Sequence, residues 1–248
     1  MSVWGKLAGS RPGKWSVWKY NWLANHKTIE ALERARPHVH GVLLDVGCGN
    51  QAFTPLFRDR ASGYVGLDLE RPAGIDGRGP DVLGRAEALP IRSSSVDTVL
   101  GLALLTYMTE PRRMLEEAHR VMRPGGTLIV EFTQIAPLWN PPHDYWRFTS
   151  FGAEHLLKEA GFEAIEWIPI GGLWAAVGLN VIGGVNRLNR GPWRIVTEIP
   201  SRILYVIFQL GFEVMDRLFD DDGERMARLV VARRIEDPAK AVDSTPRR

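Results

Sequence analysis

The amino-acid sequence predicts an α/β protein with a mostly parallel sheet, and three observations support this expectation. The chain has 248 residues, which suits one sizeable α/β domain better than two. From residue 41 onward, short apolar runs alternate with segments of helical periodicity, the order typical of repeated strand–helix units. The first apolar run ends in a glycine-rich turn, a common feature of strand-to-helix junctions that approach a ligand.

The expected elements follow from the periodicity and from the glycine and proline residues at segment ends. "PGG" at 124–126, for example, ends an amphipathic helix. In order, we expect a strand at 41–47, a helix at 50–61, strands at 63–70 and 96–105, a helix at 111–123, a strand at 127–133, a helix at 150–162, a strand at 163–170 and a last strand at 227–234.

A long segment, 171–224, separates the last two expected strands and predicts a helical insertion. Within it, 203–219 has the pattern of a helix that is apolar on most sides. Its polar residues form one narrow stripe, Gln209, Glu213, Asp216 and Arg217. The broad apolar face suits packing on the same domain, on a second subunit or in a membrane interface.

We therefore expect three parts along the chain. The first is a basic, aromatic helical segment at 1–40, and the second is a domain at 41–234 that contains the insertion. The third is a disordered tail at 235–248, which carries two prolines and scattered charges.

Charge is unevenly distributed, although the formal net charge is only +2. Residues 1–40 carry seven Lys or Arg against two Glu, among Trp4, Trp15, Trp18, Tyr20 and Trp22. Basic residues interleaved with aromatic ones suit a membrane surface, a nucleic acid or an anionic substrate. A helix that docks its aromatic side chains on the domain and turns its lysines to water is an equally good interpretation.

Cysteine content and hydropathy indicate the compartment. The only cysteine, Cys48, excludes an internal disulfide and favours a reducing environment. The longest apolar run, 203–208, is far shorter than the ~18 residues of a membrane span. We expect a cytoplasmic protein and leave peripheral contact with a membrane open.

The glycine-rich turn "LLDVGCGN", 43–50, is the strongest functional signal. "GCGNQA" fits the dinucleotide pattern, and Asp68 lies 19 residues after Gly49, where an acid that binds ribose is expected. A nicotinamide enzyme is therefore one interpretation. Asp45 argues against it, because a carboxylate so close to the turn would repel a pyrophosphate and attract a ligand with a positive end.

Three blocks of the chain resemble the class I S-adenosylmethionine-dependent methyltransferases, specifically the methyltransferase type 11-like group. They are "LLDVGCGN", "YVGLDLE" and the segment from "RAEALP" to "LIVEF" at 85–132, in register over 41–170, with 227–234 as the closing strand. The resemblance implies a Rossmann-like, seven-stranded, mostly parallel sheet of order 3-2-1-4-5-7-6. Helices would cover both faces, strand seven would be antiparallel, and S-adenosyl-L-methionine would be the cofactor.

The resemblance also assigns roles by position to the cofactor-binding residues. The loop Gly47, Cys48 and Gly49 would lie beneath the methionine part, and Asp45 near its ammonium. Asp68 would bind both ribose hydroxyls. The remaining contacts would come from Leu69, Ala86 and Glu87 at the adenine and from the backbone of Gly101 and Leu102, although core packing explains several of these apolar residues equally well.

One position departs from the family pattern. Family members often have aspartate where this chain has Arg85, so the contact with the adenine amino group is in doubt. Glu87 or a backbone carbonyl is the expected substitute.

Candidate acceptor-side residues follow the fourth and fifth strands. His143, in "PLWNPPHDYWRFT", is the best general base, since its unperturbed pKa of about 6.5 suits proton transfer near neutral pH. Asp144 would orient it, or the two would only tie the loop down together with Arg147. Tyr107 falls where the family often has a histidine beside the acceptor. The residues "HDYWRFT" resemble a variant associated with sugar, polysaccharide or lipid-linked acceptors.

The expected function is methyl transfer to a small-molecule, glycan or lipid-linked acceptor, at a hydroxyl. No metal site is expected, because the histidines do not cluster at ligand spacing. An RNA methyltransferase is an alternative, which the near-neutral charge disfavours. A non-catalytic binding or scaffold protein is another, and a homodimer through 171–224 is a possible assembly.

Overall fold

The computed structural model describes residues 16–71, 79–189, 194–219 and 223–235. The chain divides into two compact units. We call them the sheet unit, residues 32–133, 140–168 and 228–248, and the helical unit, residues 1–31, 134–139 and 169–227. Trp4, Trp15 and the predicted disordered tail after Ile235 lie outside the described residues.

Most predicted elements are present, with shifted ends. The sheet consists of β1 (Val42–Val46), β2 (Gly63–Asp68), β3 (Val82–Leu83), β4 (Val96–Gly101), β5 (Met122–Thr133), β6 (Phe162–Gly172) and β7 (Arg225–Arg234). The α-helices are α2 (Trp22–Ala35), α3 (Pro111–Val121), α4 (Ser150–Glu159), α5 (Leu173–Leu188) and α6 (Arg194–Leu218). Short 3-10 helices are η1 (Arg36–His38), η2 (Thr54–Leu56) and η3 (Leu105–Tyr107).

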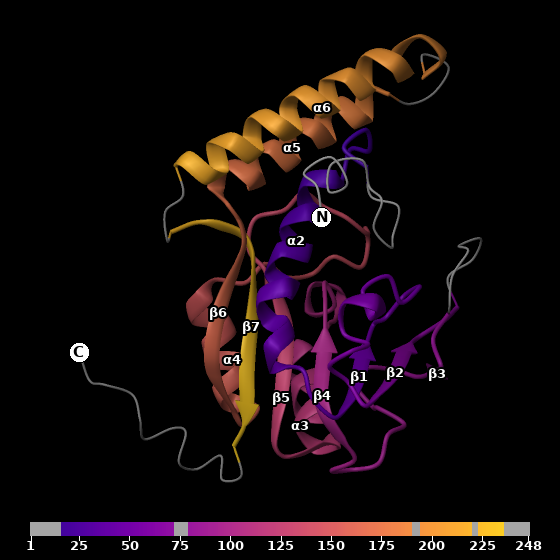
Figure 1. Ribbon diagram of the computed structural model, residues 1–248, viewed down its shortest axis with the longest axis vertical. Helices are drawn as coiled ribbons and strands as arrows, with labels where there is room; N and C mark the ends of the chain where they lie inside the picture. The colour runs from indigo at the N-terminus through magenta and orange to yellow at the C-terminus, as the bar shows by residue number, and fades with distance from the viewer. Residues whose placement is uncertain (1–15, 72–78, 190–193, 220–222, 236–248) are drawn as a thin grey trace. The chain divides into compact units, whose positions relative to one another are not determined.

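The seven strands form one sheet of order β3-β2-β1-β4-β5-β7-β6, which confirms the predicted fold class. The central strands are parallel, with Leu44 of β1 opposite Val65 of β2 and Val99 of β4. Figure 1 shows β7 running opposite to β4. Parallel strands bring their carboxyl ends to one edge, where ligands bind in folds of this kind.

The predicted helix at 50–61 is wrong. The segment is a series of turns around the 3-10 helix η2, and Gln51 has a left-handed backbone with φ of 57°. Pro55 sits inside the segment and supplies no backbone N–H. The Gln51 side chain instead donates to the carbonyl of Gly79 at 2.9 Å.

In the helical unit, α5 and α6 run alongside each other (Figure 1). Gly178 of α5 makes the close approach possible, because a Cβ at that position would lie 2.7 Å from the ring of Phe212. The segment 171–224 therefore contributes a helical hairpin between β6 and β7. No helix among the described residues is long and apolar enough to cross a membrane.

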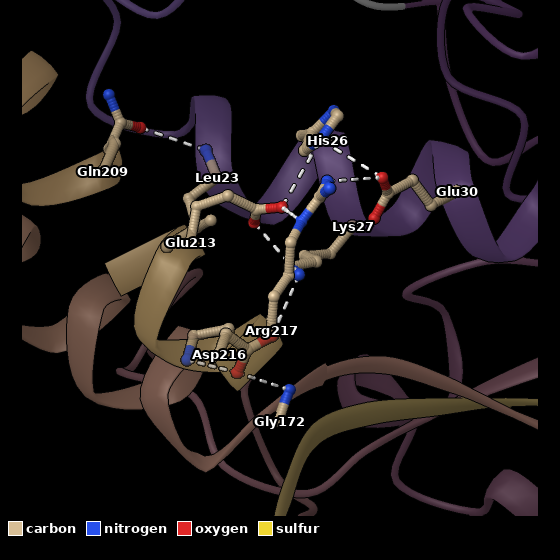
Figure 2. A network of polar contacts seen from close by, with 10 residues as sticks. Leu23, His26, Lys27, Glu30, Gly172, Gln209, Glu213, Asp216 and Arg217 are labelled. Atoms are coloured by element: carbon tan, nitrogen blue, oxygen red, sulfur yellow. Dashed lines mark hydrogen bonds and ion pairs between the residues drawn. The ribbon is translucent and has the colours of Figure 1, made fainter. Parts of the chain in front are cut away.

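Three residues of the polar stripe of α6, Gln209, Glu213 and Asp216, are buried in the interior of the helical unit (Figure 2). Gln209 accepts a hydrogen bond from the Leu23 N–H at 3.0 Å. Asp216 accepts from the backbone N–H groups of Gly172 and Ala175, both at 2.9 Å. These acceptors satisfy backbone donors at the beginnings of α2 and α5, where helices leave N–H groups without partners.

Lys27 of α2 joins the same network as its central cation. Its ammonium lies 3.0 Å from Glu213 and 2.9 Å from Asp216, and all three side chains are buried. Burial alone would lower the pKa of Lys27, but its hydrogen bond to Asp216 and the charge of Glu213 outweigh it and raise the pKa. The network therefore keeps Lys27 charged inside the unit.

His26, Glu30 and Glu213 are a group of described residues at metal-ligand spacing. Glu213 is already bound by Lys27 and, at 2.6 Å, by Arg217. Two cations at the same carboxylate oppose a third, so we interpret the group as part of the ion-pair network.

Replacing Lys27 by alanine removes the cation bound to buried Asp216 and one of the two cations bound to buried Glu213. We expect Lys27→Ala to lower the free energy of unfolding by about 3–5 kcal/mol, measured by urea denaturation. The matched control is Lys158→Ala, which removes an exposed pair with Glu154 and costs about 0.5 kcal/mol or less. Equal losses for the two variants would show that the buried network does not stabilise the fold.

Candidate functional site

The glycine-rich turn follows β1 and is fastened to the end of β2. The N–H groups of Gly47 and Cys48 donate to the Leu67 carbonyl at 2.8 and 3.1 Å. Gly47 and Gly49 have φ values of 76° and 53°, a region that side chains disfavour. A Cβ on Gly49 would meet nothing within 4 Å, so the turn has an open side at this residue. The turn thus presents bare backbone to any ligand that lies there.

Asp68 ends β2 and is oriented by the turn itself. One carboxylate oxygen accepts from the Gly49 N–H at 2.8 Å, and the other accepts from the Leu69 N–H at 2.7 Å. Each oxygen of a carboxylate has a second lone pair, so both remain able to accept from a ligand. Two parallel acceptors suit a pair of neighbouring hydroxyls. Leu69 beside them is 62% exposed and offers an apolar surface.

Asp45 lies within β1 and is buried. Burial raises the pKa of its carboxyl to about 7, although a hydrogen bond from the Tyr64 hydroxyl lowers it, and the charge of Asp68 raises it further. Among the described residues, no basic side chain forms an ion pair with Asp45 that would offset this burial. A cationic group bound at this position would stabilise its carboxylate.

Cys48, the middle residue of the turn, is buried. Burial and, to a smaller extent, the nearby carboxylates of Asp45, Asp68 and Asp81 together raise the pKa of its thiol to about 12. A thiol in this environment stays protonated at neutral pH. Its role is that of a small residue within the turn.

The predicted adenine-side residues lie between β3 and β4. Ala86 is buried, whereas Glu87 is partly exposed. Arg85, the residue that departs from the family pattern, is exposed and lies 3.6 Å from the carboxylate of Glu87. Arg85 thus holds the side chain that we expected to replace the missing aspartate.

The end of β4 contains a residue in an unusual conformation. Gly101 is buried and Leu102 partly exposed, and the next residue, Ala103, has a left-handed backbone with φ of 47°. The Ala103 N–H donates to the carboxylate of Glu131 on β5 at 3.2 Å. Non-glycine residues in this region are uncommon and are often found at functional sites.

Glu131 was not among the residues predicted from the sequence. Burial raises the pKa of its carboxyl to about 7, in spite of hydrogen bonds from Ala103 and Thr133. The sequence does contain an indication of it, because Glu131 is the one acid inside the apolar strand "TLIVEFT". A carboxyl with this pKa can exchange a proton near neutral pH.

The loop after β5 is bound to the 3-10 helix η3, which carries Tyr107. The N–H groups of Tyr145 and Trp146 donate to the Thr106 carbonyl at 2.9 and 3.3 Å. The Trp146 indole donates to the Met108 carbonyl at 2.8 Å. These bonds place the histidine-containing loop beside Tyr107.

The pKa of Tyr107 depends on two nearby acids, Asp144 in the loop and Glu131 on β5. Burial and, to a smaller extent, the charges of Asp144 and Glu131 together raise the pKa of Tyr107 to about 12. Arg147 binds Asp144 through two hydrogen bonds, of 2.5 and 2.9 Å. Tyr107 therefore remains a neutral hydroxyl that can donate or accept a hydrogen bond.

His143 is exposed, and one ring nitrogen, Nδ1, lies 3.1 Å from the Tyr145 hydroxyl. Its predicted orienting partner, Asp144, is bound to Arg147. The loop thus has its own internal hydrogen bonds, and the role of His143 in proton transfer stays a prediction.

Residues 44–130 match the family described as "methyltransferase domain". A curated relative, an uncharacterized methyltransferase of Mycobacterium bovis, is 32% identical over 120 residues. That match covers 45% of this chain and 44% of the relative, so it spans less than half the length of either protein.

Two solved structures share the fold at low identity. The 4+2 cyclase SpnF has a TM-score of 0.57 and 20% identity, over 86% of this chain and 82% of its own. A SAM-dependent methyltransferase of Thermotoga maritima, described as a possible histamine N-methyltransferase, has a TM-score of 0.55 and 19% identity, over 87% and 93%. Likeness at this level shows the fold alone.

The raised pKa of Asp45 predicts how stability depends on pH in the ligand-free protein. The folded state holds the proton more tightly than the unfolded chain, whose aspartate has a pKa near 3.8. The stabilisation from this group is therefore full below pH ~4 and is lost as the pH rises through 7.

Asp45→Asn removes this titration while keeping an acceptor for Tyr64. We expect the melting temperature of the variant, relative to the wild type, to rise between pH 5 and about pH 7 and to level off above it, since each pKa unit corresponds to about 1.4 kcal/mol. Differential scanning calorimetry measures the difference. A constant difference over this range would contradict the assigned pKa.

Proposed function

We propose that this protein, whose residues 44–130 match a methyltransferase domain, transfers a methyl group from S-adenosyl-L-methionine to a hydroxyl of a small-molecule, glycan or lipid-linked acceptor. One observation supports the cofactor most directly. Two carboxylates of different character, buried Asp45 and hydrogen-bonded Asp68, flank an open glycine turn.

The chemistry of these residues fits S-adenosylmethionine. Asp45 has the raised pKa of a buried acid without a cation and would receive the ammonium of the methionine part. Asp68 has two oriented oxygens and would accept from the ribose hydroxyls. The bare backbone at Gly49 leaves room for the ligand. A pyrophosphate would instead meet two acids, which disfavours NAD.

The bound cofactor supplies an activated methyl group on a sulfonium, so the protein has to orient the acceptor and accept its proton. Three groups are available for this: His143 in the loop after β5, the neutral hydroxyl of Tyr107, and Glu131 at the end of β5. We propose that Tyr107 positions the acceptor hydroxyl and that His143 accepts its proton. Glu131, with a pKa of about 7, is the competing base.

Two variants separate cofactor binding from chemistry. We expect Asp68→Ala to abolish binding of S-adenosylmethionine, because it removes both ribose acceptors and frees the Gly49 N–H. His143→Ala should bind the cofactor normally and lower turnover by about 100-fold, the size of a general-base contribution. Calorimetric titration measures binding, with NAD titrated in parallel, and methyl transfer to glycan and lipid-linked acceptors measures turnover.

Glu131→Gln is the matched control for the base. Normal turnover in His143→Ala together with loss in Glu131→Gln would move the proton acceptor to Glu131. Binding of NAD alone would refute the proposed cofactor. Binding of no nucleotide would favour the scaffold alternative, and a salt-sensitive complex with RNA would favour an RNA acceptor.

A further inference from the structure

The outer face of α6 is apolar along nearly its whole length. The exposed stripe consists of seven residues with exposed fractions between 37% and 73%, Val196, Ile199, Ile203, Ile207, Leu210, Val214 and Leu218. Soluble proteins rarely expose contiguous apolar surface of this extent without a binding role.

The helix cannot bury this stripe by rotating about its axis. Its opposite face holds Gln209, Glu213 and Asp216, which bind α2 and the start of α5 (Figure 2). Rotation would expose the Lys27 ion pairs and leave backbone N–H groups of Leu23 and Gly172 unbonded. The polar interior of the helical unit therefore fixes the apolar stripe on the outside.

The stripe is nearly straight. Its residues follow a 3-4-4 spacing, or eleven residues in three turns, close to the natural 3.6 residues per turn of a helix. From Val196 to Leu218, at about 1.5 Å per residue, it runs for about 33 Å. A straight apolar line of this length suits a flat, extended partner.

The exposed charged side chains of α6 are mainly arginines. Arg194, Arg202 and Arg217 have side chains exposed by 68%, 54% and 60%. Glu198 is held between Arg194 and Arg202 at 3.0 and 2.8 Å. The other acids of α6 are buried, so the described part of this helix presents positive charge outward.

A cavity of about 550 Å³ opens next to Arg194 and Arg202 within the helical unit. Its lining combines aromatic rings, amides and three cationic side chains, among them Trp18, Lys19, Asn189, Arg194, Arg202 and Tyr205. Trp18 itself is 51% exposed. Tryptophan and basic residues in a unit that also exposes an apolar helix face are typical of the headgroup level of a membrane.

We propose that the helical unit binds the surface of an anionic lipid bilayer. The α6 stripe lies among the upper parts of the acyl chains, parallel to the membrane plane, and the arginines lie at the phosphates. The cavity receives a headgroup. This arrangement does not require a membrane-spanning helix, and none is found in the described part of the chain.

Charge favours a bilayer over a second copy of the chain. Two copies joined through this face would bring the arginines of one copy toward those of the other, whereas anionic headgroups complement them. The inference does not depend on methyl transfer, so either proposal can fail without the other.

Vesicle co-sedimentation tests the proposal with the full chain. We expect the wild type to sediment with vesicles of phosphatidylcholine and phosphatidylglycerol, more weakly with phosphatidylcholine alone, and less as salt rises. The double variant Ile203→Asp, Ile207→Asp should lose binding by about tenfold or more, because it places charge in the apolar stripe. Both positions are exposed, so folding should persist, as circular dichroism will verify.

Phe151→Asp is the matched control, since Phe151 is 85% exposed on α4 in the sheet unit. It should bind vesicles as the wild type does. Equal binding by the double variant, or no binding of the wild type to anionic vesicles, would overturn the proposal. A wild-type dimer that the double variant dissociates, without vesicle binding, would identify a second copy as the partner instead.

Discussion

The burial of Asp45 at the end of β1 is the constraint on which the proposed site depends. A carboxylate in the core of a sheet is costly unless a cation or several donors stabilise it. In the free protein its carboxyl receives one hydroxyl, that of Tyr64, and lies near a second acid, Asp68. Such an arrangement destabilises the charged carboxylate in the free protein and strengthens the binding of a cationic ligand group. The glycine turn, which brings bare backbone to the same place, gives the ligand access.

The helical unit also contains buried acids, but it stabilises them with groups of its own chain. There, Glu213 and Asp216 are also buried acids, but the chain supplies Lys27 as their cation and backbone N–H groups as further donors. The result is a closed network with no need for a ligand. Its consequence appears on the opposite side of α6, where the apolar residues have no partner within the described chain. Asp45 thus lacks an ion-pair partner among the described residues, whereas Glu213 and Asp216 have one and fix the orientation of α6.

The sequence was sufficient to predict the sheet, because the signals are local, and the cofactor-side residues stay a prediction drawn from equally local signals. Asp45, Gly47 and Gly49 lie within five consecutive positions, and Asp68 closes the next strand. The strand order, however, came from resemblance to a family. The prediction of a helix at 50–61 was wrong. It rested on the apolar pattern of the segment, but Gln51 has a left-handed backbone and Pro55 lacks the N–H that a helix needs.

Long-range contacts explain the other omissions. Glu131 was missed because an acid in an apolar strand gives no indication that the N–H of Ala103 will meet it. The outward orientation of the α6 apolar face depends on contacts such as that between Leu23 and Gln209, which are 186 residues apart in sequence. Periodicity identifies the faces of a helix, but it does not tell which of them the rest of the chain will bury.

The most direct test of the account is the number of protons released when S-adenosylmethionine binds. It is measured by calorimetry at pH 6.5 in buffers of different ionisation enthalpy, for the wild type and for Asp45→Asn. If Asp45 is protonated in the free protein and receives the ammonium of the cofactor, the wild type will release most of one proton and the variant almost none. Tight binding without proton release, or the same release from both proteins, would contradict the role assigned to Asp45.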